Sequence, residues 1–196
     1  MEPCLAQTPP ITSSGLGTVV TQAGNEHAIT GGTRPGNGTN LFHSCERFNI
    51  PSGNVANFVN DMSLPTTNLL GRVTGGEVSS IFGILRATGF GEANVFLMNP
   101  AGVLFGPGAR LDIGGSFTVT TADYVKLADT IRFNAVSGPQ DALLSAAPIA
   151  AFGFLNESPT GVSIQDGQLF VEAGKTLSVV SGDVNIREGG ALVAFN

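Results

Sequence analysis

Pairs of apolar residues at positions i and i+2 recur from residue 95 onward, and each pair is followed by a turn containing Gly, Asp, Asn or Pro. This alternation is typical of short strands with one buried face. The pairs begin at Val95, Val103, Leu111, Phe117, Val125 and Ile131. The first and fourth starts are 22 residues apart, as are the second and fifth, and the third and sixth are 20 apart. The spacing predicts that three short strands make one circuit and that Val125 stacks on Val103.

The same rhythm returns near the C-terminus. Pairs begin at Val162, Leu169, Leu177, Val184 and Leu192, with Gly-containing turns between most of them. Val162 precedes Val184 by 22 residues, and Leu169 precedes Leu192 by 23. A repeat of this length with three strands and no helical segment predicts an all-β parallel β-helix. The leucine-rich repeat has a similar period, but its L-x-x-L-x-L register is absent.

The repeat divides the chain, which we expect to form one domain over residues 1–196. Residues 8–60 lack the rhythm, and since a solenoid needs a covered first coil, they are the candidate for an N-terminal cap. Coils are expected over 61–134 and again over 162–196. Within 63–73, Pro65 could open a short helix or interrupt a strand. The pattern is still that of a strand at residue 196. We therefore expect further coils of a longer exoprotein to follow.

Residues 135–161 interrupt the repeat. This segment contains three prolines and a run of alanines, neither of which suits a regular coil. We interpret it as an excursion outside the helix, a hairpin packed on one face through Ile149, Phe152 and Phe154.

Composition narrows the possible partners. Charged residues make up 12% of the chain and the net charge is −6, with no basic stripe, so no nucleic-acid partner is expected. No apolar run approaches the roughly 18 residues of a membrane helix. The start, "MEPCLAQTPP", lacks a basic region followed by an apolar one, although Leu5-Ala6-Gln7 is compatible with the remnant of a signal-peptide cleavage site.

The residues that could carry chemistry are few and scattered. Cys4 and Cys45 lie 41 residues apart, a spacing that matches no metal motif, and independent thiols are favoured over a disulfide. Only two histidines are present, His27 and His43, and nothing in the sequence clusters them with the cysteines. No metal and no cofactor is predicted.

An enzymatic reading must be considered because parallel β-helices also host polysaccharide lyases and hydrolases. Paired catalytic carboxylates would occupy equivalent positions of successive coils, about 22 residues apart, whereas Asp112 and Asp123 are 11 apart and Asp129 lies on a further step. The chain also has no Trp and one Tyr, Tyr124, as an aromatic platform for sugars. We therefore expect no enzymatic activity.

One long segment resembles a known family. "ANVFLMNPAGVLFGPGARLDIGGSFTVTTADYV" (93–125) is similar to the signature of the haemagglutination-activity domain, the two-partner secretion (TPS) domain of filamentous haemagglutinin-like exoproteins. "GTNLFHSCERFNI" (38–50), "NFVN" (57–60) and "GRVTGGEVSSIFGILRATG" (71–89) follow the order of that family. "NLFHS" and "FLMNPAGVLFG" most resemble cyanobacterial members.

The resemblance implies a fold and a function. Such domains are right-handed single-stranded parallel β-helices with an N-terminal β cap and an extra-helical hairpin or small sheet. They cross the periplasm of a Gram-negative cell, here a cyanobacterial one, and the POTRA domains of a TpsB outer-membrane transporter of the Omp85 family recognise them. Each then folds at the cell surface as a monomer, after only transient contact with the outer membrane, and nucleates β-helix folding of the exoprotein.

Two family motifs map onto the chain. The downstream Asn-Pro-Asn-Gly type corresponds to Asn99, Pro100, Ala101 and Gly102, with Ala in place of the second Asn. The upstream Asn-Pro-Asn-Leu type corresponds to "GTNL" (38–41), which retains Asn40 and Leu41 but lacks the proline.

The downstream tetrapeptide also suits a type I turn, with Asn at the first position, Pro at the second and Gly at the fourth. A structural corner and a transporter-recognition element are compatible roles for it. An adhesive or carbohydrate-binding β-helix module remains the alternative function, with a polysaccharide-active enzyme behind it.

Overall fold

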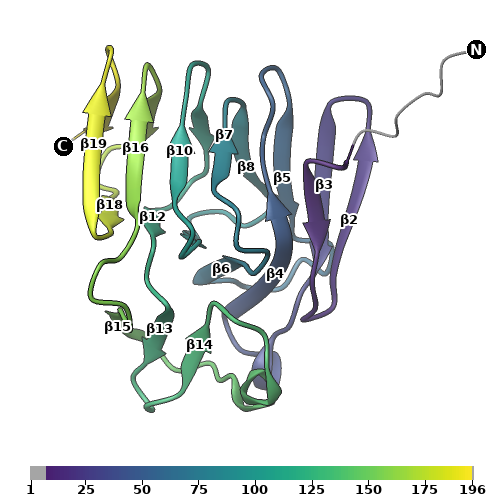
Figure 1. Ribbon diagram of the computed structural model, residues 1–196. Coiled ribbons are helices and arrows are strands. Elements are labelled where there is room, and N and C mark those ends of the chain that lie inside the picture. Colours follow the sequence, from purple (N-terminus) through teal and green to yellow (C-terminus); the bar gives the residue numbers. More distant parts are fainter. Residues whose placement is uncertain (1–7, 196) are drawn as a thin grey trace, which may run out of the picture.

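Short parallel strands stack along one axis and form three faces of a β-solenoid of about six turns (Figure 1). The computed structural model describes residues 8–195. The first face contains β1 (Ile11–Ser13), β4 (Asn40–Phe48), β6 (Asn68–Val73), β9 (Asn94–Met98), β12 (Phe117–Thr120) and β18 (Leu177–Val180). The second face contains β7 (Ser79–Ile81), β10 (Val103–Phe105), β16 (Gly161–Gln165) and β19 (Asp183–Arg187).

The third face is built in two parts. The larger part contains β2 (Thr18–Ala23), β3 (Glu26–Gly31), β5 (Val55–Val59), β8 (Ile84–Thr88) and β11 (Arg110–Asp112), and the smaller contains β17 (Gln168–Val171) and β20 (Ala191–Ala194). Two 3₁₀ turns, η1 (Pro35–Asn37) and η2 (Pro139–Leu143), lie in connections. A separate antiparallel sheet of β13 (Tyr124–Leu127), β14 (Arg132–Asn134) and β15 (Ile149–Gly153) lies outside the coils, at the bottom of Figure 1.

The strand register confirms part of the predicted stacking. Phe117 pairs with Val95 in parallel register, as the 22-residue spacing predicts. Val184 lies over Val162 and Leu192 over Leu169, again as predicted. Side chains of the same kind therefore form columns inside the helix.

The prediction that Val125 stacks on Val103 is wrong. Val103 pairs with Val162, and Val125 pairs with Phe133 and Phe152 in the extra-helical sheet. Ile131, predicted to begin a strand of the next circuit, directly precedes β14 of the same external sheet. The chain leaves the coil after β12, upstream of residue 135. The sequence pattern does not reveal this exit, because antiparallel strands with one buried face have the same two-residue alternation as coil strands.

Parallel pairing begins earlier than the sequence rhythm indicates. β4 and β5 pair in parallel with β6 and β8, so within the predicted cap at 8–60 only β1 and β2 lie antiparallel to their neighbours. The rise from Asn40 to its partner Asn68 takes 28 residues, and that from Val55 to Ile84 takes 29. The extra residues lie in loops between strands, and they hide the 22-residue period. The ambiguous stretch 63–73 contains a strand, β6, and no helix.

Two apolar layers hold the fold together. The inner layer fills the solenoid with columns of buried Val, Ile, Leu and Phe side chains. The second layer lies between the outer side of the first face and the extra-helical sheet, and it contains Phe42, Leu70, Met98, Val125, Leu127, Phe133, Ala135 and Leu144. Ile149 and Phe152 pack against this layer, as predicted for the excursion, whereas Phe154 is outside it.

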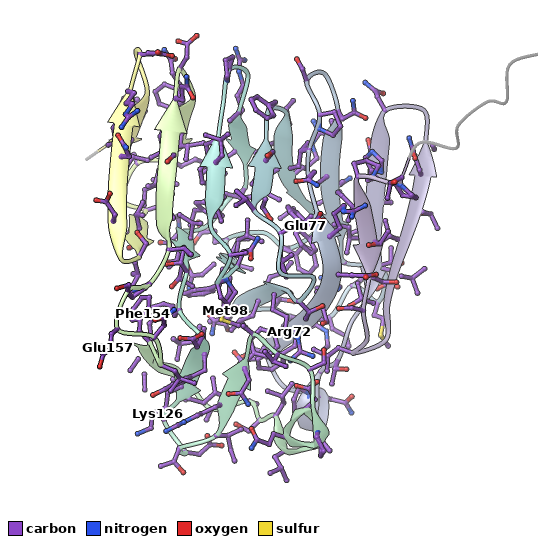
Figure 2. The ribbon with its side chains drawn as sticks, viewed as in Figure 1. Arg72, Glu77, Met98, Lys126, Phe154 and Glu157 are labelled. Atoms are coloured by element: carbon purple, nitrogen blue, oxygen red, sulfur yellow. The ribbon has the colours of Figure 1, made fainter. Side chains whose placement is uncertain are left out.

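A buried arginine joins the two sheets across the second layer. Arg72 of β6 is 1% exposed, and its guanidinium donates two hydrogen bonds to the Asp141 carboxylate, at 2.7 and 2.6 Å. It also donates to Asn134 O and Ser137 Oγ, and its Nε donates to Ser44 Oγ of the preceding coil. Figure 2 shows Arg72 and Met98 where the coils meet the extra-helical sheet.

Removing the carboxylate should destabilise the domain more than removing the arginine. Asp141→Ala leaves a buried guanidinium without its counterion, and such a loss typically costs about 3–5 kcal/mol. Arg72→Met takes a donor from Asn134 O, Ser137 Oγ and Ser44 Oγ, but the only charge it leaves unpaired is that of Asp141, whose side chain reaches solvent. Its cost should therefore be smaller. Urea unfolding measures both. Glu77→Ala, which breaks the exposed Arg47–Glu77 pair, is the control and should cost under about 1 kcal/mol. Equal losses for all three variants would contradict the assigned role of Arg72.

Candidate functional site

The tetrapeptide Asn99–Gly102 forms the corner between β9 and β10, where the chain passes from the first face to the second. Gly102 N donates to Asn99 O at 3.0 Å, which closes a turn of four residues and confirms the predicted turn. Pro100 and Ala101 at the tip are half-buried. The corner is therefore a regular part of the third coil.

The Asn99 side chain faces inward and is completely buried, with an exposed fraction of 0%. Its Nδ2 donates to Glu77 O and to Ser79 Oγ of the coil below, each at 2.9 Å. Its Oδ1 accepts from Ala101 N at 3.0 Å, and this bond fixes the tip of the turn. Every polar atom of the side chain is engaged, so Asn99 presents nothing to a partner of the folded domain.

The coil above covers the same corner. The Thr160 hydroxyl donates to Pro100 O, and Thr121 Oγ1 donates to Thr160 O. Gly102 has a φ of +111°, and a Cβ added there would lie 3.2 Å from Gly161 O. Glycine suits this position because side chains rarely adopt this φ, and a Cβ would also make a tight contact with Gly161 O.

The upstream residues Asn40 and Leu41 lie at the other corner of the first face, at the start of β4. Asn40 is 1% exposed, and its Nδ2 donates to Ser145 O at 3.3 Å and to Ala147 O at 2.8 Å. Leu41 belongs to the inner apolar layer. The two motifs therefore lie at opposite ends of first-face strands and do not meet in one site.

Sequence reasoning missed two asparagines at the same corner. Asn68 and Asn94 begin β6 and β9; Asn68 is the register partner of Asn40, and Asn94 is that of Asn68. The recurrence of Asn followed by two apolar residues at 40, 68 and 94 is visible in the sequence. It is hidden because the intervals, 28 and 26 residues, differ from the 22-residue period.

The residues considered for catalysis lie apart. Asp112 bonds to Arg86 Nε on the third face, Asp123 accepts from Leu155 N, and Asp129 caps the turn before β14. Within residues 8–195, no cluster of three or more His, Cys, Asp or Glu side chains could hold a metal ion. In the same range, no helix is long and apolar enough to cross a membrane.

Cys45 is buried in the inner layer, and burial raises the pKa of its thiol to about 12. A thiol with such a pKa is not a nucleophile at neutral pH. Cys4 lies outside the described residues, so the pairing of the two cysteines stays a prediction.

His43 on β4 is a buried titratable group with no counterion in contact. It is 0% exposed, its Nδ1 lies 3.3 Å from Thr18 Oγ1, and its Nε2 has no hydrogen-bond partner. Thr18 Oγ1 accepts from Ser44 N, which leaves its hydroxyl proton for His43 Nδ1. Burial lowers the pKa of His43 to about 4; the Asp61 charge opposes this shift and Arg34 adds to it. His43 is therefore neutral and structural at physiological pH.

The fold of this chain, a β-solenoid with a small external antiparallel sheet, has a counterpart among solved structures. The crystal structure of filamentous hemagglutinin secretion domain matches with a TM-score of 0.50, over 95% of this chain and 99% of that chain, at 17% identity. No curated protein matches the chain. A family model described as TPS secretion domain matches residues 7–194. The chain belongs to the TPS secretion domain family.

Membership defines the class of function. TPS domains are the secretion domains of TpsA-type exoproteins, they are not enzymes, and they are substrates of TpsB transporters. Their exoproteins reach the cell surface or the medium through the periplasm of Gram-negative cells.

The burial of His43 predicts a specific pH dependence of stability. Its folded pKa of about 4 lies below the ordinary value of 6.5, so between these pH values the unfolded chain binds a proton that the folded domain does not. Stability should therefore fall as the pH decreases from about 7 to about 4, by up to roughly 3 kcal/mol from this group. Urea unfolding at several pH values should show a shallower loss for His43→Gln than for the wild type. Parallel pH profiles would contradict the assignment.

Proposed function

We propose that the POTRA domains of a TpsB transporter of the Omp85 family recognise Asn99 and Pro100 in the unfolded chain, and that the same residues become a β-helix corner at the cell surface. The burial of Asn99 carries this proposal. A side chain with every polar atom bonded internally is accessible to a partner only before the coil forms. Pro100 restricts the backbone even in the unfolded chain, which favours recognition of a short linear element.

Templated folding outside the cell is the second part of the proposal. On the first face, β6 pairs with β4, β9 with β6 and β12 with β9, so each strand finds its partner in a segment that precedes it. A chain that emerges N-terminus first can therefore add coils in order. The antiparallel strands β1 and β2 would supply the first surface on which β3 and β4 align.

The proposal also covers the source of the chain, its partners, its oligomeric state and the upstream motif. The resemblance of "NLFHS" and "FLMNPAGVLFG" to cyanobacterial members supports a cyanobacterial source. The net charge of −6 supports a domain without a nucleic-acid partner. We expect a monomer whose contact with the outer membrane lasts only as long as transport, and Asn40 and Leu41 are kept as a degenerate second element.

Co-expression with the transporter tests the proposal. The exoprotein should appear outside the cell only when the cognate TpsB protein is present, and secretion independent of it would overturn the proposal. In the same assay, Asn99→Ala and Pro100→Ala should lower the secreted yield. Asn57→Ala is the matched control because Asn57 is 6% exposed and bonds the Glu26 and Thr88 side chains of neighbouring coils.

Thermal melting of the purified variants separates recognition from folding. Pro100→Ala keeps the carbonyl that Thr160 contacts, so its melting temperature should stay close to that of the wild type. A reduced yield at unchanged stability supports recognition. If the yield of every variant, Asn57→Ala included, follows its melting temperature alone, the tetrapeptide is only a turn.

A further inference from the structure

A chain of side-chain amides runs along one corner of the solenoid. Asn68 Nδ2 donates to Asn40 Oδ1 at 2.9 Å, and Asn94 Nδ2 donates to Asn68 Oδ1 at 3.2 Å. The next coil continues the chain, with Ser116 N donating to Asn94 Oδ1 at 3.2 Å and Thr176 N donating to Ser116 Oγ at 3.0 Å. One hydrogen-bonded column therefore links all five first-face strands from β4 to β18.

Groups at the two ends fix the polarity of this amide ladder. At one end the Asn40 amide meets two backbone carbonyls, Ser145 O and Ala147 O, which can only accept hydrogen bonds. At the other end Asn94 Oδ1 meets the backbone N–H of Ser116, which can only donate. The three side chains between them can satisfy both ends in one orientation only. Each coil consequently offers an acceptor to the coil that follows it.

The amide ladder distinguishes the native register from a slip of two residues, which the apolar columns do not. A slip of one residue would turn the core side chains outward and is excluded by burial. A slip of two residues keeps every apolar side chain on its own face, and it would place Leu70 or Thr66 opposite Asn40 in place of Asn68. Asn40 Oδ1 would then lose its Asn68 donor, at the cost of an unsatisfied polar group.

We infer that Asn40, Asn68 and Asn94 set the register in which each new coil adds to the folded part of the domain. Asn40 is then the first asparagine of the amide ladder. The upstream motif keeps this asparagine although it lacks the proline, because the ladder needs the amide. Ser116 extends the column to Thr176, 60 residues later, at the start of β18, the strand that resumes the first face after the extra-helical sheet, β16 and β17. The inference rests on the proposed templated folding and names the residues that direct it.

Refolding of the full chain from urea tests the inference without a transporter, so its outcome is independent of whether Asn99 is recognised. Asn68→Ala and Asn94→Ala each remove two bonds of the ladder and should slow refolding about tenfold, because the register must be found before coils can stack. Pulsed hydrogen exchange should show β12 and β18 gaining protection late. Asn57→Ala, the control, should mainly accelerate unfolding and leave refolding within about twofold of the wild type.

Serine variants provide the rescue and keep the test valid if an alanine variant does not fold. Ser116 shows that a serine at this corner accepts the N–H of the next coil, so Asn94→Ser and Asn68→Ser should refold within about twofold of the wild type. Alanine variants that change only the unfolding rate would overturn the inference. Serine variants that refold as slowly as the alanine variants, or fail with them, would also overturn it.

Discussion

The parallel hydrogen-bonded ladder between coils is the constraint on which this structure depends. On the first face it runs unbroken from β4 to β18. The register of this pairing decides which side chains of neighbouring coils lie next to one another. Core residues fall into columns, and a corner residue such as Asn99 bonds to the corner of the coil below, at Glu77 O and Ser79 Oγ. Because all these contacts follow from register, an error in one coil would be passed to every coil above it.

Polar side chains supply the specificity that apolar packing lacks. Arg72 uses all of its donor groups to hold the extra-helical sheet against the first face, and the amide ladder fixes a corner. Both involve residues that lie far downstream: Asp141 follows Arg72 by 69 residues, and Ala147 follows Asn40 by 107. The earliest coils therefore reach their final environment only after most of the domain is available to fold.

The sequence predicted the fold class, the 22-residue stacking of Phe117 on Val95 and the turn at Asn99, because these depend on local alternation and turn chemistry. It misassigned Val125 and Ile131, since strands of an antiparallel sheet have the same alternation as coil strands. Arg72 gave no signal, because its partner lies 69 residues away in the chain. Asn68 and Asn94 were overlooked because loops of unequal length make the repeat irregular. Long-range pairing therefore accounts for the first two errors, and irregular loop length for the third.

The dual role of the Asn99 corner is tested most directly by binding to the isolated POTRA region of the transporter. Phe105 is 0% exposed in the inner layer, so Phe105→Asp should keep the chain unfolded while leaving residues 99–102 intact. The POTRA region should bind this unfolded variant, bind it more weakly when Asn99→Ala is added, and not bind the folded wild type. Binding to the folded domain as tight as to the unfolded variant would contradict this account.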